Sequence, residues 1–181
     1  MRDMVGAVVI LVSIIGAVLW FYGGCSFSPG GPSVDPESAP TVDASKELDR
    51  AASSVQFAVR EPAVPSSWRA NSASTTSVGT GATADVVVRV GWVTPGGAYL
   101  QLSQSGGHGP EVVAKETGRE DNRADGTVDV AGVSWTTYPA HRDEPAWVTE
   151  LDGAVVVVTG SGSEDEFRRL ATAVQDATPL T

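Results

Sequence analysis

Residues 85–105 read DVVVRVGWVTPGGAYLQLSQS, and this stretch decides the fold of the chain. Apolar side chains recur at every second position before the Pro-Gly-Gly sequence, and Leu100 and Leu102 share one face after it. A period of two is typical of half-buried strands, and Pro-Gly-Gly indicates a tight turn. We therefore predict a β-hairpin with strands over residues 85–94 and 98–105.

The chain after this hairpin continues the strand pattern. Residues 127–130 and 133–138 predict a second hairpin. Residues 146–151 favour a further strand, with a helix as the alternative. Residues 154–159 read AVVVVT, an unbroken apolar run that is typical of a strand buried inside a sheet. Because short turns favour antiparallel pairing, we expect about six mostly antiparallel strands.

Two amphipathic helices are predicted to flank these strands. Residues 43–55 carry apolar side chains at helical spacing, and Asp43 is a suitable N-cap. The last helix begins at a capping box formed by Ser163 and Glu166. The predicted fold class is α+β, a two-layer domain over residues 43–178 with both helices on one face of the sheet.

Two stretches leave their structure open. Residues 111–117 fit either a short helix or an irregular segment. Residues 57–64 alternate in part, but Pro62 and Pro65 restrict them to an edge segment or an extended loop.

The N-terminal part differs from the rest in composition. The run from Met4 to Gly24 has no charged residue, and as a helix it would be about 31 Å long, close to the hydrocarbon thickness of a bilayer. We interpret residues 1–25 as a transmembrane anchor in the lipid bilayer and the Pro/Gly/Ser-rich residues 26–42 as a flexible linker. Arg2 is the only basic residue near the run. The positive-inside rule then predicts a single-pass protein of the cytoplasmic membrane with its N-terminus inside and its C-terminal domain outside.

A cleaved signal peptide and a lipoprotein signal with Cys25 as the lipidated residue are the alternatives to a permanent anchor. The single Arg and the long apolar run fit a signal peptide poorly. Tyr22 stands where a lipoprotein signal usually has a Leu-like residue. We therefore favour the permanent helix.

The net charge bears on the class of partner, and the cysteine content bears on how the domain is stabilised. The net charge is −10, and an acidic domain is a poor partner for nucleic acid. Cys25 is the single cysteine, so the domain is predicted to fold without a disulfide.

The sequence offers no clear catalytic or metal-binding pattern. His108 and His141 are the two histidines, and neither has another His or a Cys nearby, so we predict no metal and no cofactor. The chain contains no G-x-S-x-G motif. A serine grouped with His141 and Asp143 leaves a hydrolase as the least favoured alternative, and we assign no catalytic residues.

The aromatic residues allow two interpretations. Trp68, Trp92, Trp135 and Trp147 are many for a small domain, and burial in the core is the favoured interpretation because most large aromatic side chains are buried. The alternative is an aromatic-lined groove that carries a small ligand. The residues predicted to bind that ligand are Arg69, Asn71, Trp92, Tyr99 and Gln101.

Five segments occur in a familiar order: RDM, FSPG, VPSSWRANS, VGWVTPGGAYLQLSQS and EPAWVTELDGAVVVVTGSGSEDEFRRLA. Through them the chain resembles the bacterial family called domain of unknown function 4245. The resemblance implies a single-pass envelope protein and carries over no catalytic residue. We therefore expect a membrane-anchored, non-enzymatic binding or accessory module of the cell envelope, whose partner is an envelope protein or a small molecule.

Overall fold

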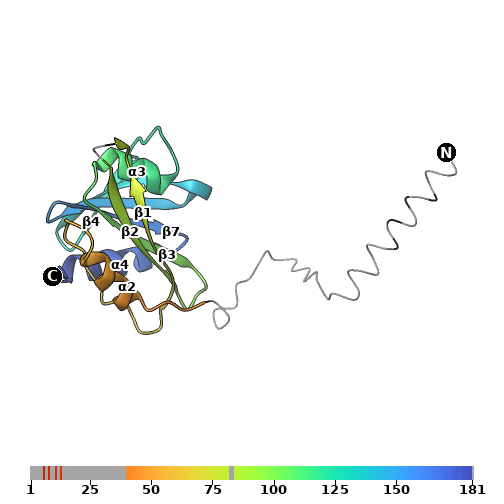
Figure 1. Ribbon diagram of the computed structural model, residues 1–181, viewed down its shortest axis with the longest axis horizontal. Helices are drawn as coiled ribbons and strands as arrows, with labels where there is room; N and C mark the ends of the chain where they lie inside the picture. Colours follow the sequence, from red (N-terminus) through yellow and green to blue (C-terminus); the bar gives the residue numbers. More distant parts are fainter. Residues whose placement is uncertain are drawn as a thin grey trace. The chain divides into compact units, whose positions relative to one another are not determined.

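A computed structural model describes residues 40–81 and 84–180, together with residues 6, 8, 11 and 13 (Figure 1). The chain divides into two units, Met1–Ser33 and Val34–Thr181, and the elements discussed below belong to the second. Among the described residues, no helix has the length and apolar character needed to cross a membrane. The predicted anchor at residues 1–25 and nearly all of the predicted linker at residues 26–42 lie outside the described residues, apart from the few positions named above, so both stay predictions.

Seven strands form one antiparallel sheet in the order β1-β2-β3-β7-β6-β5-β4. The strands are β1 (Arg69–Val78), β2 (Asp85–Val93), β3 (Tyr99–Ser105), β4 (Gly126–Val130), β5 (Val133–Pro139), β6 (Pro145–Leu151) and β7 (Ala154–Gly160). Strand β7 lies in the middle, and each of its residues is buried, as its apolar run predicts. Both predicted hairpins are confirmed, as β2–β3 and β4–β5.

The sheet has one strand that the sequence did not predict, β1. This strand reads RANSASTTSV and has few apolar side chains to alternate, and Ser74 to Ser77 are all exposed. Because a period-two signal requires one buried face, a strand exposed on both sides leaves no such signal in the sequence.

Three helices surround the sheet: α2 (Ala44–Ala52), α3 (Gly109–Thr117) and α4 (Glu164–Asp176). Both predicted caps are present. The Asp43 carboxylate accepts from the Lys46 backbone N–H at 3.1 Å. The Ser163 hydroxyl accepts from the Glu166 N–H, and the Glu166 carboxylate accepts from the Ser163 N–H at 2.8 Å. The stretch left open at residues 111–117 is helical, and it ends at Gly118, whose left-handed backbone suits glycine.

The helices cover both faces of the sheet (Figure 1). Helices α2 and α4 pack on one face, where Leu48 and Phe167 meet the apolar side chains of β2, β3 and β7. Helix α3 packs on the other face, where Val112 meets Val87 and Val157. The expected placement of two helices on one face therefore holds for α2 and α4, whereas α3 adds a third, partial layer.

Candidate functional site

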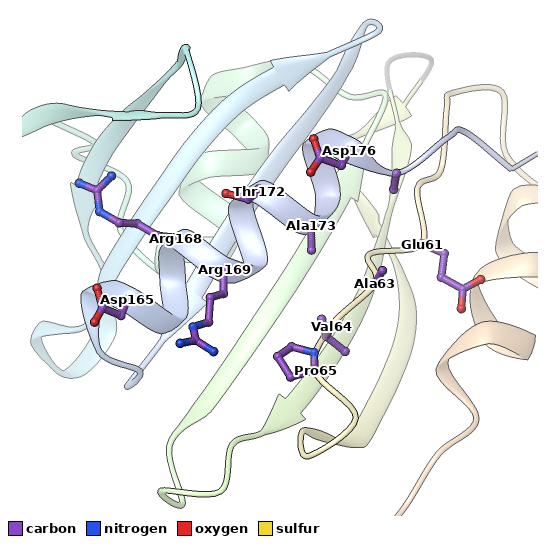
Figure 2. Close-up of a pocket in the computed structure, with 11 residues that line it drawn as sticks. Glu61, Ala63, Val64, Pro65, Asp165, Arg168, Arg169, Thr172, Ala173 and Asp176 are labelled. Carbon is purple, nitrogen blue, oxygen red and sulfur yellow. The ribbon is translucent and has the colours of Figure 1, made fainter.

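Two neighbouring hollows run along one side of α4. The larger, of about 780 Å³, lies between α4 and the segment from Glu61 to Pro65 (Figure 2). The smaller, of about 400 Å³, lies at the start of α4, beside Trp68 and the turn between β2 and β3. They share Pro65, Asp165 and Arg169, so they form one elongated depression, which we call the α4 groove.

The sequence of α4 explains how a helix can both close the core and line this groove. Its apolar stripe is buried against the sheet through Phe167, Leu170, Ala171 and Val174. The side chains between those positions face outward, and Arg169, Thr172, Ala173 and Asp176 line the groove. A period of 3.6 residues therefore assigns one stripe to stability and leaves the adjacent stripe for contact with a ligand.

The opposite wall of the groove is an extended segment that other residues fix in place. Arg60 forms an isolated β-bridge with Pro179, and its guanidinium donates to the carbonyl oxygens of Gln175, at 3.2 Å, and of Ala177. The Gln104 side chain hydrogen-bonds both the N–H and the C=O of Arg60. These contacts tie the segment to the end of α4, so the two walls are held together.

The two arginines at the groove differ in their partners. Arg168 donates to Glu164 at 2.8 Å and to the Asp129 carbonyl oxygen at 2.8 Å, and its guanidinium lies 5.8 Å from the centre of the Trp147 ring. Arg169 is exposed and makes no hydrogen bond or ion pair within the described part of the chain. In Figure 2, Arg169 projects from α4 on the side of Pro65. Arg169 is therefore the cation in the groove that a ligand can pair with.

The capping box sets the electrostatics at the start of the groove. Partial burial of the Glu166 carboxyl raises its pKa, but hydrogen bonds from Ser163 and the positive charge of Arg169 outweigh that effect. The net result is a pKa below the ordinary value of 4.5. Glu166 is therefore ionised at neutral pH and fixes the first turn of α4.

The structure distributes the five predicted ligand-binding residues over different places. Tyr99 and Gln101 lie together on the α3 face of the sheet, where the Tyr99 hydroxyl donates to the Gln101 side chain at 3.2 Å. Arg69 shares that face, because it pairs with Val93, which in turn pairs with Tyr99. None of these residues lines either hollow of the α4 groove.

The other two predicted residues lie elsewhere. Trp92 is 3% exposed and packs on the α2/α4 face, opposite Tyr99 and Gln101. Asn71 sits in a β-bulge between Ala70 and Ser72, and its side-chain oxygen is buried with no hydrogen-bond partner among the described residues. The structure therefore brings together Tyr99 and Gln101, with Arg69 on the same face, and separates Trp92 from them.

A buried polar network lies below Tyr99 and Gln101. The Glu116 side chain from α3 is 1% exposed and pairs with Arg89 of β2. The Gln101 amide donates to the same carboxylate at 3.1 Å, and the Ser103 hydroxyl also donates to it. Every charged group in this cluster has a partner. The cluster therefore has a structural role, which is to hold α3 on the sheet.

The tryptophans of the folded domain belong to the core. Trp68, Trp92, Trp135 and Trp147 are each less than one-tenth exposed, which confirms the favoured interpretation of the sequence. Trp68 alone among them lines the α4 groove.

The two histidines are separate from these features. His108 is the N-cap residue of α3, and the His141 ring lies against Gly118. In the described ranges, no hydrogen bond joins His141 to a serine, and no group of three His, Cys, Asp or Glu residues is placed to hold a metal ion.

The comparison with protein families supplies the identity of the chain. A family model described as "Protein of unknown function (DUF4245)" matches residues 1–174. The chain belongs to this family. No curated protein and no solved structure matches it. The match confirms the resemblance carried by the sequence segments.

Three of the segments that carry this family resemblance meet at the α4 groove. Pro65 and Trp68 come from VPSSWRANS, Pro95 and Gly96 come from VGWVTPGGAYLQLSQS, and α4 begins within the long C-terminal segment. The sequence did not single out Arg169. Arg168 and Arg169 are consecutive, and the sequence does not reveal that Arg168 is the one that pairs with Glu164. The signal that could have indicated the site is the helical spacing of the buried residues Phe167, Leu170, Ala171 and Val174, since it leaves the adjacent stripe of α4 facing outward.

Proposed function

We propose that this chain is a single-pass envelope protein whose domain binds an extended polypeptide segment in the α4 groove and catalyses no reaction. The observation that carries this proposal is Arg169, an exposed cation between two connected hollows. Among the described residues it makes no ion pair, and its charge acts on the nearby Glu166 carboxylate. The uncharged run at residues 4–24 and the polar linker after it support a membrane anchor with the domain outside the cytoplasmic membrane.

The chemistry of the groove supports a polypeptide with apolar side chains and one acidic side chain at the position of Arg169. Ala63, Val64, Pro65 and Ala173 supply apolar surface along the groove. The carboxylates of Glu61, Asp165 and Asp176 line it as well, so further acidic side chains of the ligand are disfavoured there. Arg169 supplies a positive charge for one carboxylate of the ligand, since a charge-assisted hydrogen bond is stronger than a neutral one. The elongated outline of the two joined hollows fits an extended chain better than a compact molecule.

The binding proposal is tested by photo-cross-linking of the full chain in its native membranes. A photoreactive residue in place of Thr172, which lines the groove, is expected to capture one specific envelope component. The adduct should be lost when Arg169→Ala is added and retained with Arg123→Ala, an exposed control outside the groove. The same photoreactive residue at Thr127, exposed on β4, is the position control. Equal yields of adduct from positions 172 and 127 would refute the groove as a binding site. An adduct yield that does not change with Arg169→Ala would refute it as well.

The anchor is tested separately by extraction and protease access. We expect the full chain to stay with the membranes at alkaline pH and to require detergent for release. Protease added to intact cells with a permeable outer layer should remove the domain. Release without detergent, or protection of the domain until the cells are lysed, would contradict the anchor or its orientation, whatever the groove binds.

A further inference from the structure

The sheet has two edges, and they are built differently. Strand β4 has five residues, and Arg168 of α4 donates to its Asp129 carbonyl oxygen at 2.8 Å. Two acidic residues, Asp125 and Asp129, stand before and within β4. Short length, charge and a covering side chain are the usual means by which proteins protect a sheet edge from pairing with another strand.

Strand β1 lacks these protections over most of its length. It has ten residues, and at its start the Val42 N–H donates to the Ala70 carbonyl oxygen at 3.0 Å. From Ser72 to Val78, no described residue outside β2 forms a hydrogen bond with the β1 backbone. Four consecutive residues, Ser74 to Ser77, are exposed, so both faces of the strand are open there. This edge therefore presents a row of unpaired backbone donors and acceptors.

Charge makes the same edge suitable for a second copy of the chain. The protein has a net charge of −10, which disfavours contact between most of its surfaces. No charged residue and no proline stands between Arg69 and Asp85. Two β1 strands can therefore approach each other without like-charge repulsion, and their Ser and Thr side chains can hydrogen-bond across the strands.

We propose that β1 pairs antiparallel with β1 of a second copy, which joins the two sheets across a two-fold axis. The pairing is self-complementary, because the same edge serves both copies. The protected β4 edge disfavours a β1–β4 contact, which would extend into a fibre instead of closing. The structure thus favours a closed dimer.

The surface beside β1 leaves room for the added strand. A hollow of about 350 Å³ lies between α2 and Thr75 and is also lined by Arg50 and Val55. Side chains of the added strand that point toward the α2 side can enter this space. Since those side chains come from β1 itself, they are small ones such as alanine, serine and threonine. None of the residues from Ser72 to Ser77 lines the α4 groove, so this interface is separate from that groove.

The experiment is a cysteine scan of the full chain, purified in mild detergent in a Cys25→Ser background. Single cysteines replace each residue from Ser72 to Ser77 in turn, and mild oxidation traps any pair that lies close to its own copy. We expect disulfide-linked dimers at the positions nearest the two-fold axis, at least tenfold above a Thr127→Cys control on β4. Yields should fall with distance along β1 on either side of the axis.

A lysine placed on the β1 edge gives a second test that uses no added cysteine. The Thr75→Lys variant should convert the dimer to a monomer in sedimentation velocity, whereas Thr127→Lys should leave it a dimer. A far-ultraviolet circular dichroism spectrum like that of the unmodified chain and a cooperative thermal transition show that each variant is folded; the transition of a monomeric variant is expected at a lower temperature. A purified chain that is monomeric at every accessible concentration, or β1 cross-links no stronger than the β4 control, overturns the proposal. A dimer that persists in Thr75→Lys overturns it as well.

Discussion

The two faces of the sheet hold their helices by different physical means. On the face of α2 and α4 the contacts are apolar, and Trp147 and Phe167 meet there with ring centres 5.1 Å apart. On the face of α3 a small apolar cluster around Val112 is joined by the buried pair of Arg89 and Glu116. Apolar packing tolerates a choice of similar side chains, whereas a buried ion pair fixes one register.

This difference suggests a division of tasks between the faces. The apolar face supplies most of the stability, and its helix α4 can therefore leave an outward stripe free for binding. The α3 face determines where a short helix sits, because Glu116 must reach Arg89, Gln101 and Ser103 together.

The largest loss is expected on the apolar face. Phe167 is 1% exposed, and Phe167→Ala should lower the free energy of unfolding by about 3–5 kcal/mol because it removes buried area and leaves a cavity. Thr172→Ala on the outward stripe is the matched control and should change it by less than about 0.5 kcal/mol. Urea titration measures both. A Phe167→Ala loss below about 1 kcal/mol would mean that α4 is not a main support of the fold.

The buried pair predicts an asymmetry between single and double variants. Glu116→Ala should cost about 3 kcal/mol, because it leaves the Arg89 charge buried without its partner. The double variant Arg89→Met/Glu116→Leu should recover most of that loss, since it removes both charges. Urea titration of the three variants tests this. If the double variant is as unstable as the single one, the α3 face depends on the charges themselves for stability.

A close approach on the α3 face predicts an intermediate effect. A methyl group at Gly91 would collide with the hydroxyl of Tyr99 and with Ser72. Gly91→Ala should therefore cost about 1–3 kcal/mol through overpacking. Adding Tyr99→Ala removes the collision with the Tyr99 hydroxyl and leaves the one with Ser72, so the two substitutions together should cost less than their separate losses combined. Additive losses in thermal unfolding would show that Tyr99 does not cover Gly91.

The capping box predicts a small loss that depends on pH. Glu166→Ala should lower stability by about 1 kcal/mol at neutral pH. Because the folded-state pKa of Glu166 lies below 4.5, its ionised form stabilises the fold above that value, and the contribution disappears as the pH falls through the folded-state pKa. The difference in stability between the unmodified chain and Glu166→Ala should thus narrow as the pH falls below 4.5. A difference that does not narrow on acidification would contradict the role of the carboxylate.

Local signals in the sequence were sufficient for much of the fold. Pro95-Gly96-Gly97 specified the first hairpin, and Ser163 with Glu166 specified the start of α4. Both depend on residues close together in the chain, so pattern and turn chemistry identify them.

Features formed by distant residues were not accessible in the same way. Arg89 and Glu116 lie 27 positions apart, and nothing local indicates that they pair. Strand β1 escaped detection because its exposed serines and threonines carry no periodic burial signal. The α4 groove combines segments around Pro65, Pro95 and Arg169, so its existence depends on the sheet topology.

The central claim is that the outward stripe of α4 binds a partner while its buried stripe supports the fold. The most direct test pairs two readouts on Arg169→Ala in the full chain: urea unfolding and photo-cross-linking from position 172. We predict an unfolding free energy within about 0.5 kcal/mol of the unmodified chain, because Arg169 is exposed and makes no hydrogen bond or ion pair with the residues that the structure describes. We predict loss of the cross-linked adduct in the same variant. An adduct of unchanged yield, or a loss of the adduct that accompanies unfolding, would contradict the claim.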